Sequence, residues 1–324
     1  MPTALVTGAN SGIGFSFAQV LLKEGYKVFA VDRHVGDGLK NLREASVGEL
    51  DVTSPDAIKE FRDKFIQDDP IDLLLNIAGV AMPREKDSLE STTIDTFEKV
   101  FAVNTYGPMF VSQTLLPNLM KSPNAKIGIV TSRVGSIGDN TSGGMYAYRS
   151  SKAAANSIGR SMAMDLKEKN IPVLLLHPGF VRSSLLPGAD GPEFVDPEEA
   201  ASKLWNNVVK VKGMSETGTF WHREGHELPC ILTHLAAPIS NMGYPSFTKT
   251  YHNQPYPPID PTRLELSAAG RLITGAGSGI GSSAAIAFAR ARAKAKIVVL
   301  TGPRVENLED TKKKIETTAR SSEK

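Results

Sequence analysis

The feature that most constrains the fold is a glycine-rich turn near the start of the chain. An apolar run at residues 4–6 leads into TGANSGIG at residues 7–14, and apolar residues then recur at helical spacing as far as Gly25. A second apolar run, at residues 28–31, closes on Asp32. This order of strand, glycine turn, helix, strand and acid predicts a βαβ unit that binds a dinucleotide. Its glycines let the backbone approach a pyrophosphate, which the first amides of the helix bind.

The end of the second predicted strand bears on which dinucleotide binds. Asp32 would accept hydrogen bonds from a ribose hydroxyl and repel a 2′-phosphate, which indicates NAD(H). Arg33 beside it could bind a 2′-phosphate bidentately, which indicates NADP(H). We favour NAD(H) and keep NADP(H) as the alternative. A third strand is predicted at residues 47–51, and Asp51 at its end either holds the adenine amino group or caps a turn.

Strands and helices alternate along the rest of the first 230 residues. A nearly continuous apolar segment at residues 71–79 predicts a strand buried on both faces. A long amphipathic helix is predicted at residues 94–120, with Asn104 in its middle. Two more buried strands are predicted at residues 127–132 and 173–176. This alternation predicts an α/β fold, a Rossmann-like doubly wound parallel sheet.

In a doubly wound sheet the ligand lies beyond the carboxyl ends of the strands. Polar residues and glycines of this chain gather at those ends. They are Gly8, Asp32, Asp51, Asn76, Ser132 and residues 177–179. We therefore expect the functional site at this edge of the sheet.

A tyrosine and a lysine between the last two of these strands form a candidate acid/base pair. Tyr148 and Lys152 are four residues apart on a predicted helix and therefore share one face. A nearby ammonium favours a phenolate, so we expect Lys152 to lower the pKa of Tyr148 and let it exchange protons near neutral pH. The same spacing also arises by chance, so the pair gains weight only from the motifs upstream.

Several motifs occur in a fixed order within the first 230 residues. They are TGxxxGxG at 7–14, NxAG at 76–79, Asn104, Ser132 at the end of Val-Thr-Ser, Tyr148 with Lys152, and PGFVRS at 178–183. In this order they resemble the short-chain dehydrogenase/reductase family, in its single-domain branch. The run SRVGSI at 132–137, with a long polar insert before Tyr148, is similar to the small carbonyl reductases grouped with C-factor and Sniffer.

The resemblance implies an NAD(P)-dependent oxidoreductase that transfers a hydride between a nicotinamide and a carbonyl or secondary alcohol. Tyr148 would donate or remove the proton, and Ser132 would bond the same oxygen. Lys152 would lower the pKa of Tyr148 and bond the nicotinamide ribose, while Asn104 would hold a water that relays protons. Ser132 is favoured over Ser136 because it ends a strand.

The resemblance also implies which residues bind the cofactor. They are Gly8, Asn10, Ser11, Gly12, Ile13, Gly14, Asp32, Arg33, Asp51, Val52, Asn76, Ala78, Gly79, Tyr148, Lys152, Pro178, Gly179, Val181 and Ser183. Ser183 stands where the family usually has threonine, and it keeps the hydroxyl for the carboxamide side of the cofactor.

Two other functions are compatible with the same fold. A nucleotide-binding sensor or scaffold would keep the cofactor site without turnover, and an epimerase or dehydratase would show no net cofactor turnover. The substrate is expected to be a small carbonyl compound or alcohol. A homo-oligomer is an expectation of the family.

Composition limits the partners and the setting. A formal net charge of +2 with 22% charged residues makes nucleic acid and anionic membranes poor partners. No apolar run reaches membrane-spanning length. The single cysteine, Cys230, fits a reducing compartment, so we expect a cytoplasmic protein. His222 and His226 are four residues apart but lack the context of a metal site, so we expect no metal.

A second glycine turn, at residues 274–281, repeats the first almost letter for letter. A helix to about residue 292, a strand at 296–300 and a charged helix to 318 are predicted after it. The repeat stops before any counterpart of Asn76, Asn104, Ser132 or Tyr148. Two strands and two helices would bury little surface, so we expect this partial βαβα unit to be catalytically inert.

These patterns divide the chain into three parts. Residues 1–230 form a complete dinucleotide-binding domain, residues 231–265 a proline-rich linker, and residues 266–324 a truncated Rossmann-like repeat.

Overall fold

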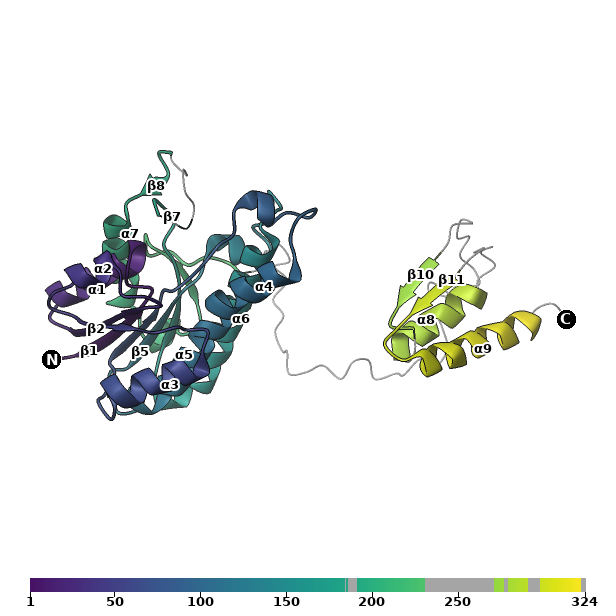
Figure 1. The fold of residues 1–324 in the computed structure, drawn as a ribbon, viewed down its shortest axis with the longest axis horizontal. Coiled ribbons are helices and arrows are strands. Elements are labelled where there is room, and N and C mark those ends of the chain that lie inside the picture. The colour runs from purple at the N-terminus through teal and green to yellow at the C-terminus, as the bar shows by residue number, and fades with distance from the viewer. Residues whose placement is uncertain (184, 186–190, 231–270, 277–278, 291–297, 322–324) are drawn as a thin grey trace. The chain divides into compact units, whose positions relative to one another are not determined.

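Among the described residues, seven parallel strands form the sheet of the first unit (Figure 1). Their order is β3 (Ser46–Glu49), β2 (Lys27–Asp32), β1 (Thr3–Thr7), β4 (Leu73–Asn76), β5 (Lys126–Val130), β6 (Val173–His177) and β9 (Phe220–His222). Strand order reverses between β1 and β4, and this is the switch point where doubly wound sheets bind ligands. The prediction of a doubly wound parallel sheet is confirmed.

The computed structural model describes residues 1–183, 185, 191–230, 271–276, 279–290 and 298–321. The chain divides into two compact units, Met1–Ala236 and Ala237–Lys324. The predicted linker at residues 231–265 lies outside the described residues.

Helices cover both faces of the sheet in the first unit (Figure 1). One face carries α1 (Gly12–Lys23), α2 (Asp37–Asn41) and α7 (Pro197–Leu204), and the other α3 (Pro55–Phe61), α5 (Gly107–Leu119) and α6 (Tyr146–Asp165), with α4 (Ile94–Phe101) packed on α6. Side chains alternate along each strand, so Leu5 of β1 enters the core beside α5 and α6, while Ala4 and Val6 enter the core beside α1 and α7. These two cores hold the carboxyl ends of the strands in place.

Several helices begin at residues that satisfy their free amides. Ser54 caps α3 by accepting the N–H of Ala57 at 3.2 Å, and Thr93 caps α4 by accepting the N–H of Thr96 at 3.2 Å. The helix α6 differs, because its N-cap is Met145 with φ 55° and no side-chain cap.

The long helix predicted at residues 94–120 is interrupted. After α4 comes a π turn, η3 (Ala102–Tyr106), and α5 follows it. Pro108 lacks an N–H, so the carbonyl of Asn104, four residues earlier, loses its α-helical donor. π turns of this kind often occur at functional sites.

In the second unit the structure describes a strand-helix-strand-helix arrangement. Its elements are β10 (Arg271–Thr274), α8 (Gly279–Arg290), β11 (Val298–Thr301) and α9 (Val305–Ser321), with β10 and β11 parallel. The turn after β10 has the same close approach as the first glycine turn, because a Cβ on Gly281 would lie 2.2 Å from the Gly275 oxygen. The hydroxyl of Thr311 in α9 donates to the Ala276 oxygen at 2.9 Å and so fastens α9 to this turn.

Candidate active site

The first glycine turn is packed so tightly that side chains are excluded from it. A Cβ on Gly14 would lie 2.1 Å from the Gly8 oxygen, and one on Gly8, whose φ is +68°, would lie 2.7 Å from Ala78 Cα. The Thr7 hydroxyl accepts the N–H groups of Ile77 and Ala78 at 3.0 and 3.1 Å. The turn is therefore held against the loop that follows β4.

The N-terminus of α1 fits a pyrophosphate. Its N-cap, Ser11, has extended backbone and makes no side-chain cap bond, so the first amides of the helix keep no side-chain acceptor. Gly12 has φ +55°, and a Cβ there would meet only Ser183 Cβ, at 3.9 Å. Open space and uncapped amides at one helix end form the kind of cradle that binds phosphate. The residues predicted to bind the dinucleotide at this turn, Ile13 among them, lie at this helix end.

Three charged residues lie at the end of this cradle beyond β2. The Asp32 carboxylate accepts the N–H of Asn10 at 3.1 Å and that of Arg33 at 2.7 Å. Burial acts to raise the pKa of Asp51, but hydrogen bonds from Thr53 and the positive charge of Arg33 together lower it. Arg33 is therefore close enough to Asp51 for its charge to act on that carboxyl group.

Two other predicted cofactor contacts have structural partners. The Asn10 side chain accepts the Leu39 N–H at 3.1 Å and so anchors α2. Val52 is 7% exposed and packs against Gly107, where a Cβ would lie 2.9 Å from Val52 Cγ2.

Ser132 and Tyr148 are brought together at the carboxyl end of β5. Ser132 caps a short 3-10 turn, η4 (Arg133–Gly135), by accepting the N–H of Val134 at 3.4 Å, and its side chain lies close enough to the Tyr148 hydroxyl to act on its pKa. The hydroxyl of Ser136, the rival serine, donates to the Pro229 oxygen at 2.8 Å. Of the two serines, Ser132 is therefore the one that faces the tyrosine.

Burial dominates the electrostatics of the Tyr148 and Lys152 pair. It raises the pKa of Tyr148 to about 12, although the hydrogen bond with Ser132 acts in the opposite direction. It lowers the pKa of Lys152 to about 8. The Lys152 ammonium donates to the Val130 oxygen at 3.0 Å and lies 5.9 Å from the centre of the Tyr148 ring. We expected a lowered Tyr148 pKa, whereas burial raises it, and Ser132 rather than Lys152 is the group that acts to lower it.

Asn104 connects the π turn to the site. Its side chain accepts the Val80 N–H at 2.8 Å, donates to the Val80 oxygen at 2.9 Å and donates to Ser151 Oγ at 3.1 Å. A Cβ on Gly79 would lie 3.3 Å from Asn104 Oδ1 and 3.5 Å from Lys152 Nζ. Both amide hydrogens of the Asn104 side chain are therefore used, and its oxygen accepts one bond.

Asn76 is buried at the end of β4. It is 2% exposed, and its amide donates to Ser112 Oγ of α5 at 3.1 Å. The side chain therefore fixes the loop that follows, including Gly79, by bonding inward.

A buried arginine that the sequence analysis missed supports the loop at residues 178–183. Arg223 is 8% exposed and donates to the Pro178 oxygen at 2.7 Å, where Gly179 takes φ +78°. A Cβ on Gly179 would lie 1.9 Å from Arg223 Nη1, so only glycine fits. Val181 lies in β7 (Phe180–Val181), which pairs with β8 (Phe194–Val195). Nothing in the sequence pattern links Arg223 to this loop, because 45 residues separate it from Pro178.

His177, which the sequence analysis placed at the carboxyl end of its strand without a role, supports the serine side of the site. Its Nδ1 accepts the N–H of Arg133 at 3.3 Å, directly after Ser132. Burial, assisted by His222 and nearby arginines, lowers the pKa of His177 to about 3. The imidazole is therefore neutral and remains an acceptor for this amide.

A family model described as short chain dehydrogenase matches residues 2–190. The chain belongs to the short-chain dehydrogenase family. The match contains the glycine turn, Ser132, Tyr148 and Lys152, and so covers the site described above.

Several relatives of this short-chain dehydrogenase are named as dehydrogenases or carbonyl reductases. The 1-hydroxy-2-glutathionyl-2-methyl-3-butene dehydrogenase of Rhodococcus sp. (strain AD45) is 37% identical over 227 residues, 69% of this chain and 98% of that protein. A carbonyl reductase from chicken fatty liver, solved with NADPH bound, is 29% identical with a TM-score of 0.65, over 70% of this chain and 98% of that one. The carbonyl reductase Sniffer of D. melanogaster is 27% identical with a TM-score of 0.64, over 70% of this chain and 99% of that one.

These likenesses confirm the resemblance inferred from the motifs, including that to Sniffer. This short-chain dehydrogenase is an oxidoreductase that uses a nicotinamide cofactor. The sensor or scaffold alternative is not favoured.

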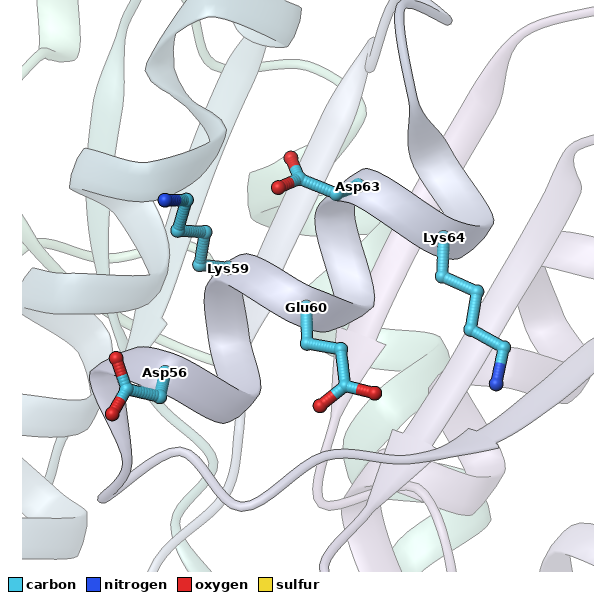
Figure 2. A pocket seen from close by; sticks show the side chains of 5 residues that line it. All are labelled: Asp56, Lys59, Glu60, Asp63 and Lys64. Atoms are coloured by element: carbon cyan, nitrogen blue, oxygen red, sulfur yellow. The ribbon is translucent and has the colours of Figure 1, made fainter.

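The short-chain dehydrogenase also has a hollow on its surface, along α3 and the π turn η1 (Arg62–Ile66). It is lined by Asp56, Lys59, Glu60, Asp63 and Lys64. Figure 2 shows these side chains pointing to different sides of the helix rather than converging. All are exposed, and acids and lysines alternate as on a solvated helix face. None of the predicted site residues lines this hollow, so the chemistry is assigned to the site around Tyr148.

Two further features concern the described part of the short-chain dehydrogenase. No group of three or more histidine, cysteine, aspartate or glutamate side chains there is arranged to hold a metal ion. No helix in those residues has the length and apolar character needed to cross a membrane.

Proposed function

We propose that this short-chain dehydrogenase interconverts a small carbonyl compound and the corresponding alcohol, with Tyr148 as acid and base. The observation that carries the proposal is that Ser132 lies close enough to the buried Tyr148 hydroxyl to lower its pKa, with Lys152 one helical turn along α6. A bound nicotinamide supplies or accepts the hydride. The carbonyl oxygen accepts a hydrogen bond from Ser132 and takes its proton from Tyr148.

The protonation state of Tyr148 favours reduction at neutral pH. With a pKa of about 12, the phenol keeps the proton that a carbonyl oxygen must receive. Oxidation of an alcohol needs the phenolate, so that direction is expected to quicken as pH rises. Lys152 would bond the nicotinamide ribose, and Asn104 would hold the water that returns protons to the site.

Cofactor preference depends on two adjacent residues. Asp32 lies beside the glycine turn and would repel a 2′-phosphate, which supports NAD(H). Arg33 and the NADPH-bound carbonyl reductase from chicken support NADP(H). We keep NAD(H) as the proposal, because the Asp32 carboxylate is bonded to the turn itself while Arg33 is exposed.

The acid/base role of Tyr148 is tested by Tyr148→Phe, with Tyr146→Phe as the matched control on the same helix. Initial rates are measured with NADH and NADPH on diacetyl, benzaldehyde and cyclohexanone. We expect Tyr148→Phe to lower kcat by about 10²- to 10⁴-fold, because the proton donor is lost, while cofactor affinity is kept. Tyr146 is 38% exposed, so its variant is expected to keep wild-type rates.

Equal turnover in Tyr148→Phe and wild type would overturn the proposal. Saturable cofactor binding without turnover of any carbonyl would favour the sensor or scaffold. An epimerase or dehydratase would instead show a changed substrate with no net change in cofactor absorbance.

A further inference from the structure

The helix that carries Tyr148 begins in a way that its own sequence does not explain. Met145, its N-cap, has φ 55° and ψ 47° and makes no side-chain cap bond. Gly143 and Gly144 before it also have positive φ, of 61° and 64°. A thioether accepts hydrogen bonds only weakly, so the first amides of α6 have no local cap. The start of a buried helix must then be set by another part of the chain.

Asp87, in the loop between β4 and α4, supplies the missing cap. Its Oδ1 accepts the N–H of Ala147 at 2.8 Å, and its Oδ2 accepts the N–H of Tyr148 at 3.1 Å. Its main-chain oxygen accepts the N–H of Met145 at 2.8 Å. One residue therefore holds three amides at the start of α6, among them that of Tyr148.

In the part of the chain that the structure describes, hydrogen bonds and a helix end, rather than a lysine or arginine, surround the side chain of Asp87. The residue is 0% exposed, and among the described residues no lysine or arginine pairs with it. The Thr92 hydroxyl donates to Oδ1 at 3.3 Å, and the positive end of the α6 dipole faces the carboxylate. Because this buried side chain bonds particular amides of α6, it fixes the position at which the helix begins.

We propose that Asp87 is the positioning residue for Tyr148. By bonding the amide of the tyrosine itself, it sets where the hydroxyl meets Ser132, which lies on a different element. The glycine turn that would bind the cofactor belongs to β1 and α1, so losing Asp87 is expected to lower kcat without weakening cofactor binding. This inference rests on the proposed role of Tyr148.

The test compares Asp87→Ala and Asp87→Asn with Thr93→Ala, which removes the cap of α4 instead. We measure kcat and KM with the best-reduced compound of the carbonyl panel, and cofactor affinity by nicotinamide fluorescence. Asp87→Ala is expected to lower kcat about 100-fold, because a small displacement of a reacting group slows a reaction by about this factor. Asp87→Asn keeps one acceptor oxygen, so its kcat is expected to fall less than that of Asp87→Ala. Thr93→Ala is expected to keep kcat within about twofold, because its lost cap affects stability rather than Tyr148.

Each result distinguishes this inference from the proposal on which it rests. If both Asp87 variants fold and keep wild-type kcat, or if Asp87→Ala weakens cofactor binding as much as it lowers kcat, Asp87 has no positioning role. Should Asp87→Ala not fold, Asp87→Asn alone decides. If Tyr148→Phe loses turnover while the Asp87 variants keep full activity, only the positioning role of Asp87 is refuted. Full activity in Tyr148→Phe refutes both the acid/base role of Tyr148 and the positioning role of Asp87.

Discussion

The buried ammonium of Lys152 makes the stability of the folded protein depend on pH. Its ammonium is 4% exposed and bonds only a backbone oxygen, and burial lowers its pKa to about 8. An unfolded lysine has a pKa near 10.4. Since the folded pKa is the lower one, the charged form is penalised in the folded protein. The penalty is complete below about pH 8 and absent above about pH 10.4, so the contribution of Lys152 to unfolding free energy rises through this window.

We predict that Lys152→Met is more stable than wild type at neutral pH, by up to about 3 kcal/mol, and that this advantage disappears by about pH 10.5. Urea unfolding is followed by tryptophan fluorescence, because both tryptophans, Trp205 and Trp221, belong to the first unit. Lys59→Met, on the exposed face of α3, is the control and should change little. A Lys152→Met variant no more stable than wild type at neutral pH would contradict the assigned penalty.

At the scale of elements, the two glycine turns have the same geometry but different surroundings. A Cβ on Gly14 or on Gly281 would lie 2.1 or 2.2 Å from the oxygen of the glycine six residues earlier. The first turn is joined to a seven-stranded sheet and faces Ser183, whereas the described part of the second unit has two strands. Within the described residues, we therefore expect the first turn to be the one that binds a dinucleotide.

We predict that Gly14→Ala abolishes cofactor binding, because the turn must open to admit the methyl group, and overpacking costs about 1–3 kcal/mol. Gly281→Ala imposes the same clash in the second unit and is expected to leave cofactor binding and turnover unchanged. Nicotinamide fluorescence titration of both variants provides the measurement. Weaker cofactor binding in Gly281→Ala would show that the second turn contributes to the site.

The break in the predicted helix at residues 94–120 is also a matter of elements. The apolar pattern continues across residues 102–106, so periodicity alone predicts one helix. Pro108 was the available signal, because it removes the donor for the Asn104 carbonyl. The π turn allows Asn104 to bond both backbone groups of Val80.

At the scale of the whole molecule, the question is whether the second unit matters for catalysis. Residues 136 and 137 contact the backbone of Pro229 and Cys230, so the first unit needs its chain intact to this point. We propose that everything after Ala236, the boundary of the first unit, is dispensable for turnover.

We predict that a variant ending at Ala236 and the full chain have the same turnover and each bind one cofactor per chain. Titration with NADH and then NADPH measures both the number of sites and the preference. Tighter binding of NADPH would assign the selection to Arg33 instead of Asp32. A folded but inactive truncated protein would refute the prediction that the second unit is inert.

The sequence by itself determined the features that depend on local pattern. Glycines 8 and 14, the apolar strands and the order of the motifs were sufficient to predict the doubly wound sheet, because strand period and turn chemistry act between near neighbours. The placement of Tyr148 and Lys152 on one helical face followed for the same reason.

Only the tertiary structure decided how these groups behave. It assigned Ser136 to Pro229 and Ser132 to Tyr148, and it reversed the expected direction of the Tyr148 pKa shift. The supports from Asp87, Arg223 and His177 join segments remote in sequence. Desolvation and long-range hydrogen bonds depend on which elements pack together, and no periodicity along the chain encodes that packing.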